Sequence, residues 1–413
     1  MANPLSTLLL VALLSLSAAA ATRTKLQPTN NVDGGICKSL VETQGYACEE
    51  HKVTTADGYV LGLQRIPAGR SGNKTAAKLP VLLQHGLLMD ASAWLLNEPD
   101  KALAFILADK GFDVWLANAR GTESSRGHTS LSPNDPAYWD WSWDELTAYD
   151  LPAAFQYVNN QTGQKLHYVG HSLGTLTALA AFSQEKLLNL LRSAALLSPI
   201  AYLGQISPFG RTAADIFLAQ VTQLDELLFY FEIMGFLGLA LLGSQAFPNE
   251  QVNRLLDFIC TRPGIDCSNF LSVTTGPNCC LSSSSIDALF KHTPQTTSTK
   301  NALHLFQMVR KGTIEMYDYG LPITNMQHYR QPTPPVYNMA NIPKDVPLFL
   351  SYGGRDLLSN VFDVNLLLDN LKDHDKDKLV VQFREDYAHM DFIMAMNANQ
   401  VVYDPLLSFF RLH

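Results

Sequence analysis

The sequence of 413 residues is poor in positive charge, and this shortage excludes one class of partner. Lys and Arg number 30 against 38 Asp and Glu, which gives a formal net charge of −8 at pH 7. Nucleic-acid binding needs a basic face that neutralises phosphates, so nucleic acid is not expected as a partner. Charged residues make up 16% of the chain and hydrophobic residues 47%, a balance typical of a globular protein.

Two zinc-binding patterns are also missing, because the chain contains neither a C-x-x-C pair nor an H-E-x-x-H motif. We therefore expect no metal site and no cofactor. The cysteines are better candidates for disulfides, and they stand at Cys37, Cys48, Cys260, Cys267, Cys279 and Cys280. Local loops close at the smallest entropic cost. We therefore expect Cys37 to pair with Cys48, and Cys267 to pair with Cys279 or Cys280.

The chain lacks an uninterrupted apolar run long enough for a transmembrane helix. The run from Leu8 to Leu16 is short, and small residues follow it, so residues 1–21 are expected to be a cleaved signal peptide. This predicts the secretory pathway, with an extracellular or a vacuolar or lysosomal destination. The apolar run 227–243 is interrupted by Glu232 and by glycines, and is expected to pack on the domain or to face lipid.

Two glycosylation sequons fit a secreted surface, one at Asn73 and one at Asn160.

Short apolar runs alternate with helical segments over most of the chain, which predicts an α/β fold with a mostly parallel sheet and helices on both faces. A hairpin is expected over 49–66, with Asp57-Gly58 at its turn. Buried strands are expected at 79–84, 112–117, 193–199, 346–352 and 378–383, and helices at 102–109, 143–158 and 361–371. The alternation stops over 203–310, which indicates an inserted, mainly helical cap between core segments 22–202 and 311–413.

One strand-turn-helix pattern, over 165–183, carries Gly170-His171-Ser172-Leu173-Gly174. This is the pattern of a nucleophile elbow, in which Ser172 stands at a sharp, strained turn. Glycine is needed at 170 and 174 because the strand and the helix approach each other closely there.

A serine becomes a nucleophile only when an imidazole takes its proton and an acid orients that imidazole. For this elbow the chain order is Ser, acid, His. Asp356 closes one late strand and His389 follows the next, so both fit. Four competitors fit less well. Asp363 and Asp369 lie in a helix pattern, where a solvated carboxylate is expected, and His374 lies in a charged surface run. Asp391 lies so close to His389 that it is expected to support the loop instead.

The oxyanion of the reaction needs backbone donors. We expect these to be the N–H of Leu173, directly after the serine, and the N–H of Leu87, in the loop after strand 79–84. His85 is expected to fix that loop by hydrogen bonds, and His171 to support the elbow or its packing.

Several longer motifs resemble the acid lipases, the group of lysosomal acid lipase, gastric lipase and plant triacylglycerol lipase 2-like proteins. The resemblance spans roughly residues 40–405 and is carried by segments 59–66, 85–88, 115–121, 149–152, 166–174, 317–320, 353–358 and 389–392. It implies an α/β-hydrolase fold with a cap and lid over the active site. It also implies Ser172 as nucleophile, Asp356 as acid, His389 as base, and Leu87 and Leu173 as oxyanion donors. Animal members usually carry Gln at the position of Leu173, so their acyl-chain preference does not transfer.

The favoured hypothesis is a serine ester hydrolase that cleaves long-chain acyl esters, above all triacylglycerols, at a lipid–water interface. Sterol-ester hydrolysis and short-chain carboxylesterase activity are alternatives within the enzyme class. A non-catalytic lipid-binding protein on the same fold is the alternative outside it. The sequence does not indicate an oligomeric state.

Overall fold

The structure is a computed structural model, and it describes residues 35–71, 78–206, 271, 272 and 274–413, with single positions 211, 214, 215 and 218 between them. The residues from 36 onward form one compact unit.

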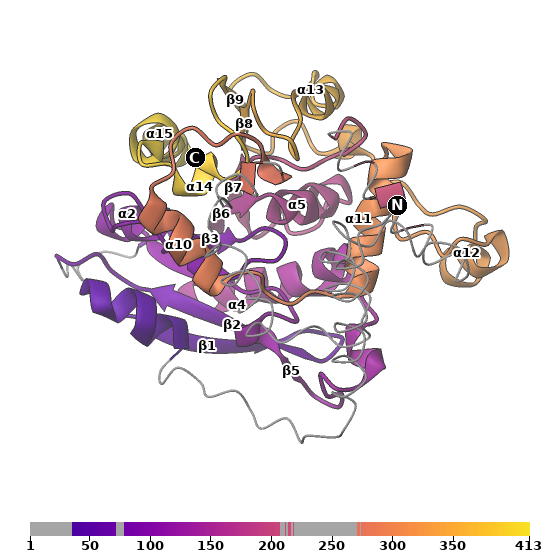
Figure 1. Cartoon of the computed structure of the whole chain (residues 1–413), viewed down its shortest axis with the longest axis horizontal. Coiled ribbons are helices and arrows are strands. Elements are labelled where there is room, and N and C mark those ends of the chain that lie inside the picture. Colours follow the sequence, from indigo (N-terminus) through magenta and orange to yellow (C-terminus); the bar gives the residue numbers. More distant parts are fainter. Residues whose placement is uncertain are drawn as a thin grey trace, which may run out of the picture. The chain divides into compact units, whose positions relative to one another are not determined.

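A nine-stranded sheet forms the centre of this unit (Figure 1). Its strands are β1 (Glu49–Thr54), β2 (Tyr59–Ile66), β3 (Pro80–Gln84), β4 (Asp113–Ala117), β5 (Gly127–His128), β6 (Leu166–His171), β7 (Leu191–Leu197), β8 (Leu348–Gly353) and β9 (Leu379–Arg384). Their order is β1-β2-β4-β3-β6-β7-β8-β9, and β5 pairs with β2. β2 is antiparallel to β1, β4 and β5, and all pairs from β4 to β9 are parallel. The mostly parallel sheet and the hairpin over 49–66 are thus confirmed.

Side chains of the central strands alternate between two hydrophobic cores, one on each face of the sheet. On β3, Leu82 belongs to one core, whereas Val81 and Leu83 belong to the other. Because both faces are covered, these strands have apolar residues at successive positions. This explains why each was visible in the sequence as a short apolar run.

Helices cover both faces, as predicted. Those of the described chain are α2 (Leu103–Asp109), α3 (Trp143–Glu145), α4 (Leu151–Thr162), α5 (Leu173–Ser183), α10 (Ser283–His292), α11 (Thr299–Lys311), α12 (Pro322–Tyr329), α13 (Val361–Asn370), α14 (Asp391–Met394) and α15 (Asp404–Leu412). Helices α4, α5, α11 and α13 contribute buried residues to one core, and α2, α10, α14 and α15 contribute to the other. Ala302 and Leu303 of α11 form a separate small cluster. In Figure 1 the two groups lie on opposite sides of the strands.

The helix expected over 143–158 is longer and less regular than its pattern suggested. Ser142 and Glu145 form a capping box at its start. The chain then passes from α3 through a π-helical turn (Leu146–Asp150) into α4, which ends at Gly163 in the left-handed conformation.

One of the two expected disulfides is confirmed, since Cys37 is bonded to Cys48. The expected partner of Cys267 is wrong for both alternatives, because Cys279 and Cys280 are bonded to each other. Adjacent residues close the smallest loop that a chain allows, and the two Cα atoms lie 3.7 Å apart. Cys260 and Cys267 lie outside the described residues.

The proposed cap over 203–310 is described only in part. Its described portion contains α10 and most of α11. The apolar run 227–243, the residues 1–21 and the sequon at Asn73 lie outside the described residues. Within the described chain, no helix is both long and apolar enough to cross a membrane.

Candidate active site

Ser172 lies at the sharp turn between β6 and α5. Its φ of 54° and ψ of −119° are strained for a residue with a side chain. The glycines on either side permit the turn. A Cβ on Gly170 would come within 2.8 Å of the Gly174 carbonyl oxygen, and one on Gly174 within 2.6 Å of the Gln84 carbonyl oxygen. Strand, turn and helix can approach this closely only when both positions lack a side chain.

A buried acid and a histidine come together beside this turn. Asp356 follows β8 and His389 follows β9, so parallel pairing of the two strands brings their loops to the same edge of the sheet. His389 Nδ1 lies 2.9 Å from Asp356 Oδ2 and 3.1 Å from Oδ1. Each side chain is about 3% exposed or less.

Asp356 is held in its ionised form. Burial acts to raise the pKa of its carboxyl, but the His389 imidazole and two backbone donors outweigh it and leave the pKa below its usual value. The donors are the N–H groups of Leu358 and Ser359, at 2.8 and 2.7 Å from Oδ1. An ionised carboxylate only accepts hydrogen bonds, so the proton between Asp356 and His389 lies on Nδ1.

His171, the residue before Ser172, contacts the loop that carries His389 and not the elbow alone. Its Nε2–H donates to the His389 carbonyl at 3.0 Å, and the Ser198 hydroxyl donates to the same oxygen at 3.3 Å. The rings of His171 and His389 lie 4.8 Å apart. Burial lowers the pKa of His171 to about 3, so its ring is neutral. The prediction of elbow support therefore misses its principal contact, the backbone of His389.

The loop after β3 passes directly beside Ser172. A Cβ added to Gly86 would lie 2.8 Å from Ser172 Cβ and 3.3 Å from Ser172 Oγ. Leu87 is the next residue, so its N–H lies in the loop that borders the serine. On the other side, Leu173 is the first residue of α5, whose hydrogen bonds to the Ser172 carbonyl begin only at Thr175. First-turn N–H groups such as that of Leu173 are available to a ligand.

His85 fixes this loop, as predicted. The N–H of Ala119 donates to His85 Nε2 at 3.1 Å, and His85 Nδ1–H donates to the Gly86 carbonyl at 2.8 Å. In a trans peptide the C=O and the next N–H point in opposite directions. Holding the Gly86 carbonyl therefore also sets the direction of the Leu87 N–H. Burial lowers the pKa of His85 to about 4, which keeps the ring neutral.

Among the described residues, no hydrogen bond joins Asp363, Asp369 or His374 to Asp356 or His389, and the burial of two of these competitors was misjudged. Asp363 is buried rather than solvated, and it accepts a hydrogen bond from the N–H of Gln205 at 3.0 Å. His374 is buried rather than on the surface, and its Nε2–H donates to the Val346 carbonyl at 2.7 Å. In both cases tertiary packing covers a side chain whose sequence neighbours are charged or exposed.

One group of side chains has the composition of a metal site, namely Cys279, Cys280 and Asp391. The two sulfur atoms are bonded to each other, so they are not available as thiolate ligands. Asp391 accepts backbone hydrogen bonds, one of them from Ala388 at 2.8 Å. It therefore supports the histidine loop, as its position two residues after His389 predicts.

The fold and the arrangement of this site are those of an α/β hydrolase, and comparisons of the chain with known protein families and solved structures agree. The alpha/beta hydrolase fold family matches residues 80–227, and a family described as partial alpha/beta-hydrolase lipase region matches residues 37–98. A solved structure, a soluble variant of monoglyceride lipase from Saccharomyces cerevisiae in complex with a substrate analog, superposes with a TM-score of 0.51 at 14% identity. The match covers 87% of this chain and 94% of that one. At this identity the likeness shows the fold alone.

Curated relatives narrow the class. Triacylglycerol lipase 2 of Arabidopsis thaliana is 49% identical over 391 residues, which are 93% of this chain and 89% of that protein. Gastric triacylglycerol lipase of Mus musculus is 36% identical over 393 residues, 93% of each chain. The chain therefore belongs to the acid lipase family of α/β hydrolases. It is a carboxylic ester hydrolase, which argues against the alternative of a non-catalytic lipid-binding protein.

Proposed function

We propose that this protein hydrolyses long-chain acyl esters, above all triacylglycerols, through an acyl-enzyme on Ser172. The observation that carries the proposal is the buried Asp356–His389 pair beside a serine held at a strained elbow. Such a pair supplies the base and its orienting acid, while the elbow presents the hydroxyl.

In the proposed reaction His389 Nε2 accepts the proton of Ser172 Oγ as this oxygen attacks the ester carbonyl carbon. Nε2 is the basic nitrogen because Nδ1 carries the proton shared with ionised Asp356. The backbone N–H groups of Leu87 and Leu173 stabilise the oxyanion of the tetrahedral intermediate. Collapse of the intermediate transfers the proton from Nε2 to the leaving alcohol. Water then attacks the acyl-enzyme with His389 again as base, and releases the fatty acid.

The substrate class rests on the relatives, which are named triacylglycerol lipases and match nearly the whole chain. A lipid–water interface is the site where such substrates are met. Sterol esters and short-chain esters are the alternative substrates, and relative rates on emulsified triolein, cholesteryl oleate and soluble p-nitrophenyl butyrate separate the three. Activity confined to p-nitrophenyl butyrate would contradict the long-chain assignment.

The proposed location is the secretory pathway, with an extracellular or a vacuolar or lysosomal destination. Two disulfides in the described chain support it, since such bonds persist in oxidising compartments. The sequon at Asn160 fits as well, because that side chain is exposed on α4. A loss of apparent mass on glycosidase treatment that becomes smaller in Asn160→Gln would establish modification there.

The test of the nucleophile is Ser172→Ala, with Ser183→Ala as the matched control. Ser183 is a buried serine at the end of α5, the helix that follows Ser172, and its hydroxyl donates to the Ala180 carbonyl at 2.8 Å. We expect Ser172→Ala to abolish fatty acid release from emulsified triolein and labelling by a fluorophosphonate probe, with the fold retained. Ser183→Ala should keep both. Undiminished hydrolysis by Ser172→Ala would refute the mechanism.

A further inference from the structure

A short segment that is distant in sequence from Asp356 and His389 contacts both of their loops. This clamp segment, residues 275–280, begins with Thr275, whose carbonyl oxygen accepts from the N–H of His389 at 3.2 Å and from the N–H of Leu357 at 3.4 Å. Leu357 directly follows Asp356. A single carbonyl group thus connects the histidine with the residue beside its acid.

The clamp segment also contacts the residue after His389. The N–H of Met390 donates to Asn278 Oδ1 at 3.0 Å, and the Asn278 amide group donates back to the Gly276 carbonyl at 3.0 Å. Gly276 itself has a φ of 99°, and a Cβ there would lie 2.0 Å from the Arg355 carbonyl oxygen. The segment can lie this close to the Asp356 loop only because position 276 is glycine.

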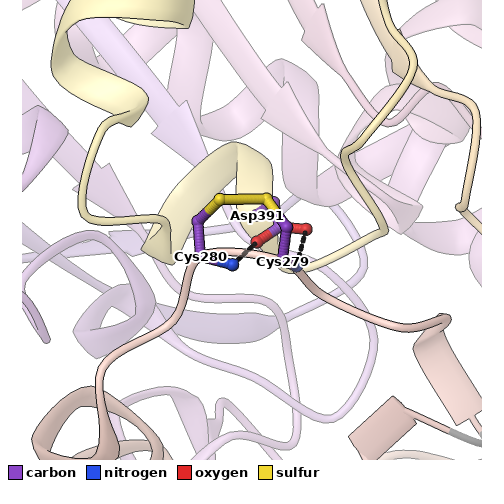
Figure 2. Close-up of side chains that lie close together, drawn as sticks. All are labelled: Cys279, Cys280 and Asp391. Carbon is purple, nitrogen blue, oxygen red and sulfur yellow. Dashed lines mark hydrogen bonds between the residues drawn. A yellow bond between two sulfur atoms is a disulfide. The ribbon is translucent and has the colours of Figure 1, made fainter.

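The third contact is a carboxylate that joins the clamp segment to the histidine loop. Asp391 is fully buried, and its oxygens accept from the N–H groups of Cys279 at 3.1 Å and Cys280 at 3.2 Å (Figure 2). A third bond comes from the N–H of Ala388, the residue before His389, at 2.8 Å. Burial raises the pKa of the Asp391 carboxyl, and the three donors act against that rise.

The disulfide gives this arrangement its geometry. A bond between neighbouring cysteines closes a small ring that restricts the peptide between them. The N–H groups of both cysteines point at the Asp391 carboxylate (Figure 2). Together the contacts reach His389 and both of its neighbours in the chain. Among the described residues, none of these contacts reaches Ser172 or the loop after β3 that carries Leu87.

We propose that Asp391 is a positioning residue. It acts with the Cys279–Cys280 disulfide to hold His389 where its imidazole can accept the proton of Ser172. The inference rests on the proposed roles of Ser172, Asp356 and His389. Asp391 touches neither substrate nor the imidazole and acts through the backbone of residues 388–390. A displacement of about 1 Å in a reacting group can cost roughly a hundredfold in rate, so this support contributes to turnover and not to substrate binding.

The first experiment is Asp391→Asn, which keeps the size of the side chain but places an NH₂ group against backbone donors. On p-nitrophenyl butyrate we expect kcat to fall by roughly 10- to 100-fold with KM within about twofold. The rate of fluorophosphonate labelling of Ser172 should fall in parallel. The control is Asp363→Asn, which removes another buried carboxylate that accepts a backbone N–H. It should lower the melting temperature and leave kcat within about twofold.

A second pair of variants tests the disulfide. Cys279→Ser with Cys280→Ser should lower kcat in the same way, whereas Cys37→Ser with Cys48→Ser removes the disulfide that precedes β1 and should lower only the melting temperature. Should Asp391→Asn not fold, Asn278→Ala removes the acceptor of the Met390 N–H and carries the same prediction with a smaller loss, about fivefold in kcat.

The outcomes separate the inference from the mechanism beneath it. If wild-type protein is not labelled at Ser172, the proposed mechanism fails whatever Asp391→Asn does. If wild-type protein is labelled and a folded Asp391→Asn variant matches its kcat and labelling rate, Asp391 serves stability alone and the inference is overturned.

Discussion

The supports of Ser172 fall into two groups, which are built in different ways. The oxyanion side comprises Leu87, Leu173 and the loop after β3, and the base side comprises Asp356, His389 and their loops. On the oxyanion side, the hydrogen bonds of His85 stay within a short stretch of the chain, since His85 bonds to Gly86 and Ala119, and Leu173 opens the helix after the serine. One contact comes from farther away, because the N–H of Gln295 donates to the Leu88 carbonyl at 2.7 Å. On the base side, the His389 backbone is held by His171, Ser198 and Thr275, which come from distant parts of the chain.

The two sides differ in how much of their support comes from neighbouring strands of the sheet. The oxyanion side follows from β3, β4 and β6, which are adjacent in the sheet. The base side also needs residues 275–280, which lie within the predicted cap. Perturbation of residues 275–280 should therefore disturb the base before it disturbs the oxyanion donors.

The largest effect is expected on the base side, from Asp356→Asn. An amide neither stabilises the imidazolium nor fixes the proton on His389 Nδ1, so kcat on p-nitrophenyl butyrate should fall by roughly 10³- to 10⁴-fold. Asp369→Asn, which changes an exposed carboxylate on α13, is the control and should stay within about twofold. A loss below tenfold in Asp356→Asn would remove Asp356 from the proposed triad.

The next effect is expected on the oxyanion side, from Gly86→Ala. The new methyl group would lie 2.8 Å from Ser172 Cβ, so the loop must move and carry the Leu87 N–H with it. Loss of one oxyanion donor costs roughly 10²- to 10³-fold in kcat. Gly163→Ala, at the end of α4, meets nothing within 4 Å and should leave kcat unchanged. Equal kcat in the two variants would show that this loop does not serve the oxyanion.

The places of the proposed triad residues in the fold could be predicted from the sequence. Buried parallel strands appear as short apolar runs, and each predicted residue lies just beyond such a run, so sheet topology brings Ser172, Asp356 and His389 to one edge. Gly170 and Gly174 were visible for a related reason, because a close approach of backbone segments admits only glycine.

The supports of the base side were largely invisible. Thr275 acts through its carbonyl oxygen, a group that every residue carries. One of Cys279 and Cys280 was expected to bond to Cys267, and the sequence does not show that these two neighbours bond to each other. His374 was misjudged because its charged neighbours describe the surface around it and not its own burial, and Asp363 because a helix pattern does not show which segment packs over a carboxylate.

A smaller effect on activity is expected from His85, because it acts on the oxyanion through the Gly86 carbonyl. His85→Ala should lower kcat about tenfold and leave KM nearly unchanged, since the buried ring bonds to the backbone of Gly86 and Ala119. His85→Gln offers an NH₂ group that can donate and a carbonyl oxygen that can accept, as the two nitrogens of the neutral imidazole do, and should restore part of the loss. If Ala and Gln behave alike in steady-state kinetics on p-nitrophenyl butyrate, the two hydrogen bonds do not set the direction of the Leu87 N–H.

The smallest effect concerns stability against pH, again through His85. Its pKa is lowered to about 4 in the folded chain, against about 6.5 for an unfolded histidine. Between these values the unfolded chain binds the proton and the folded chain does not, so wild-type stability falls as the pH falls. Glutamine does not titrate. From pH 6.5 to pH 5 the free energy of unfolding of the wild type should therefore fall relative to His85→Gln by up to about 2 kcal/mol. Urea unfolding at both pH values measures this difference, and a constant difference would mean that His85 is protonated or solvated in the folded protein.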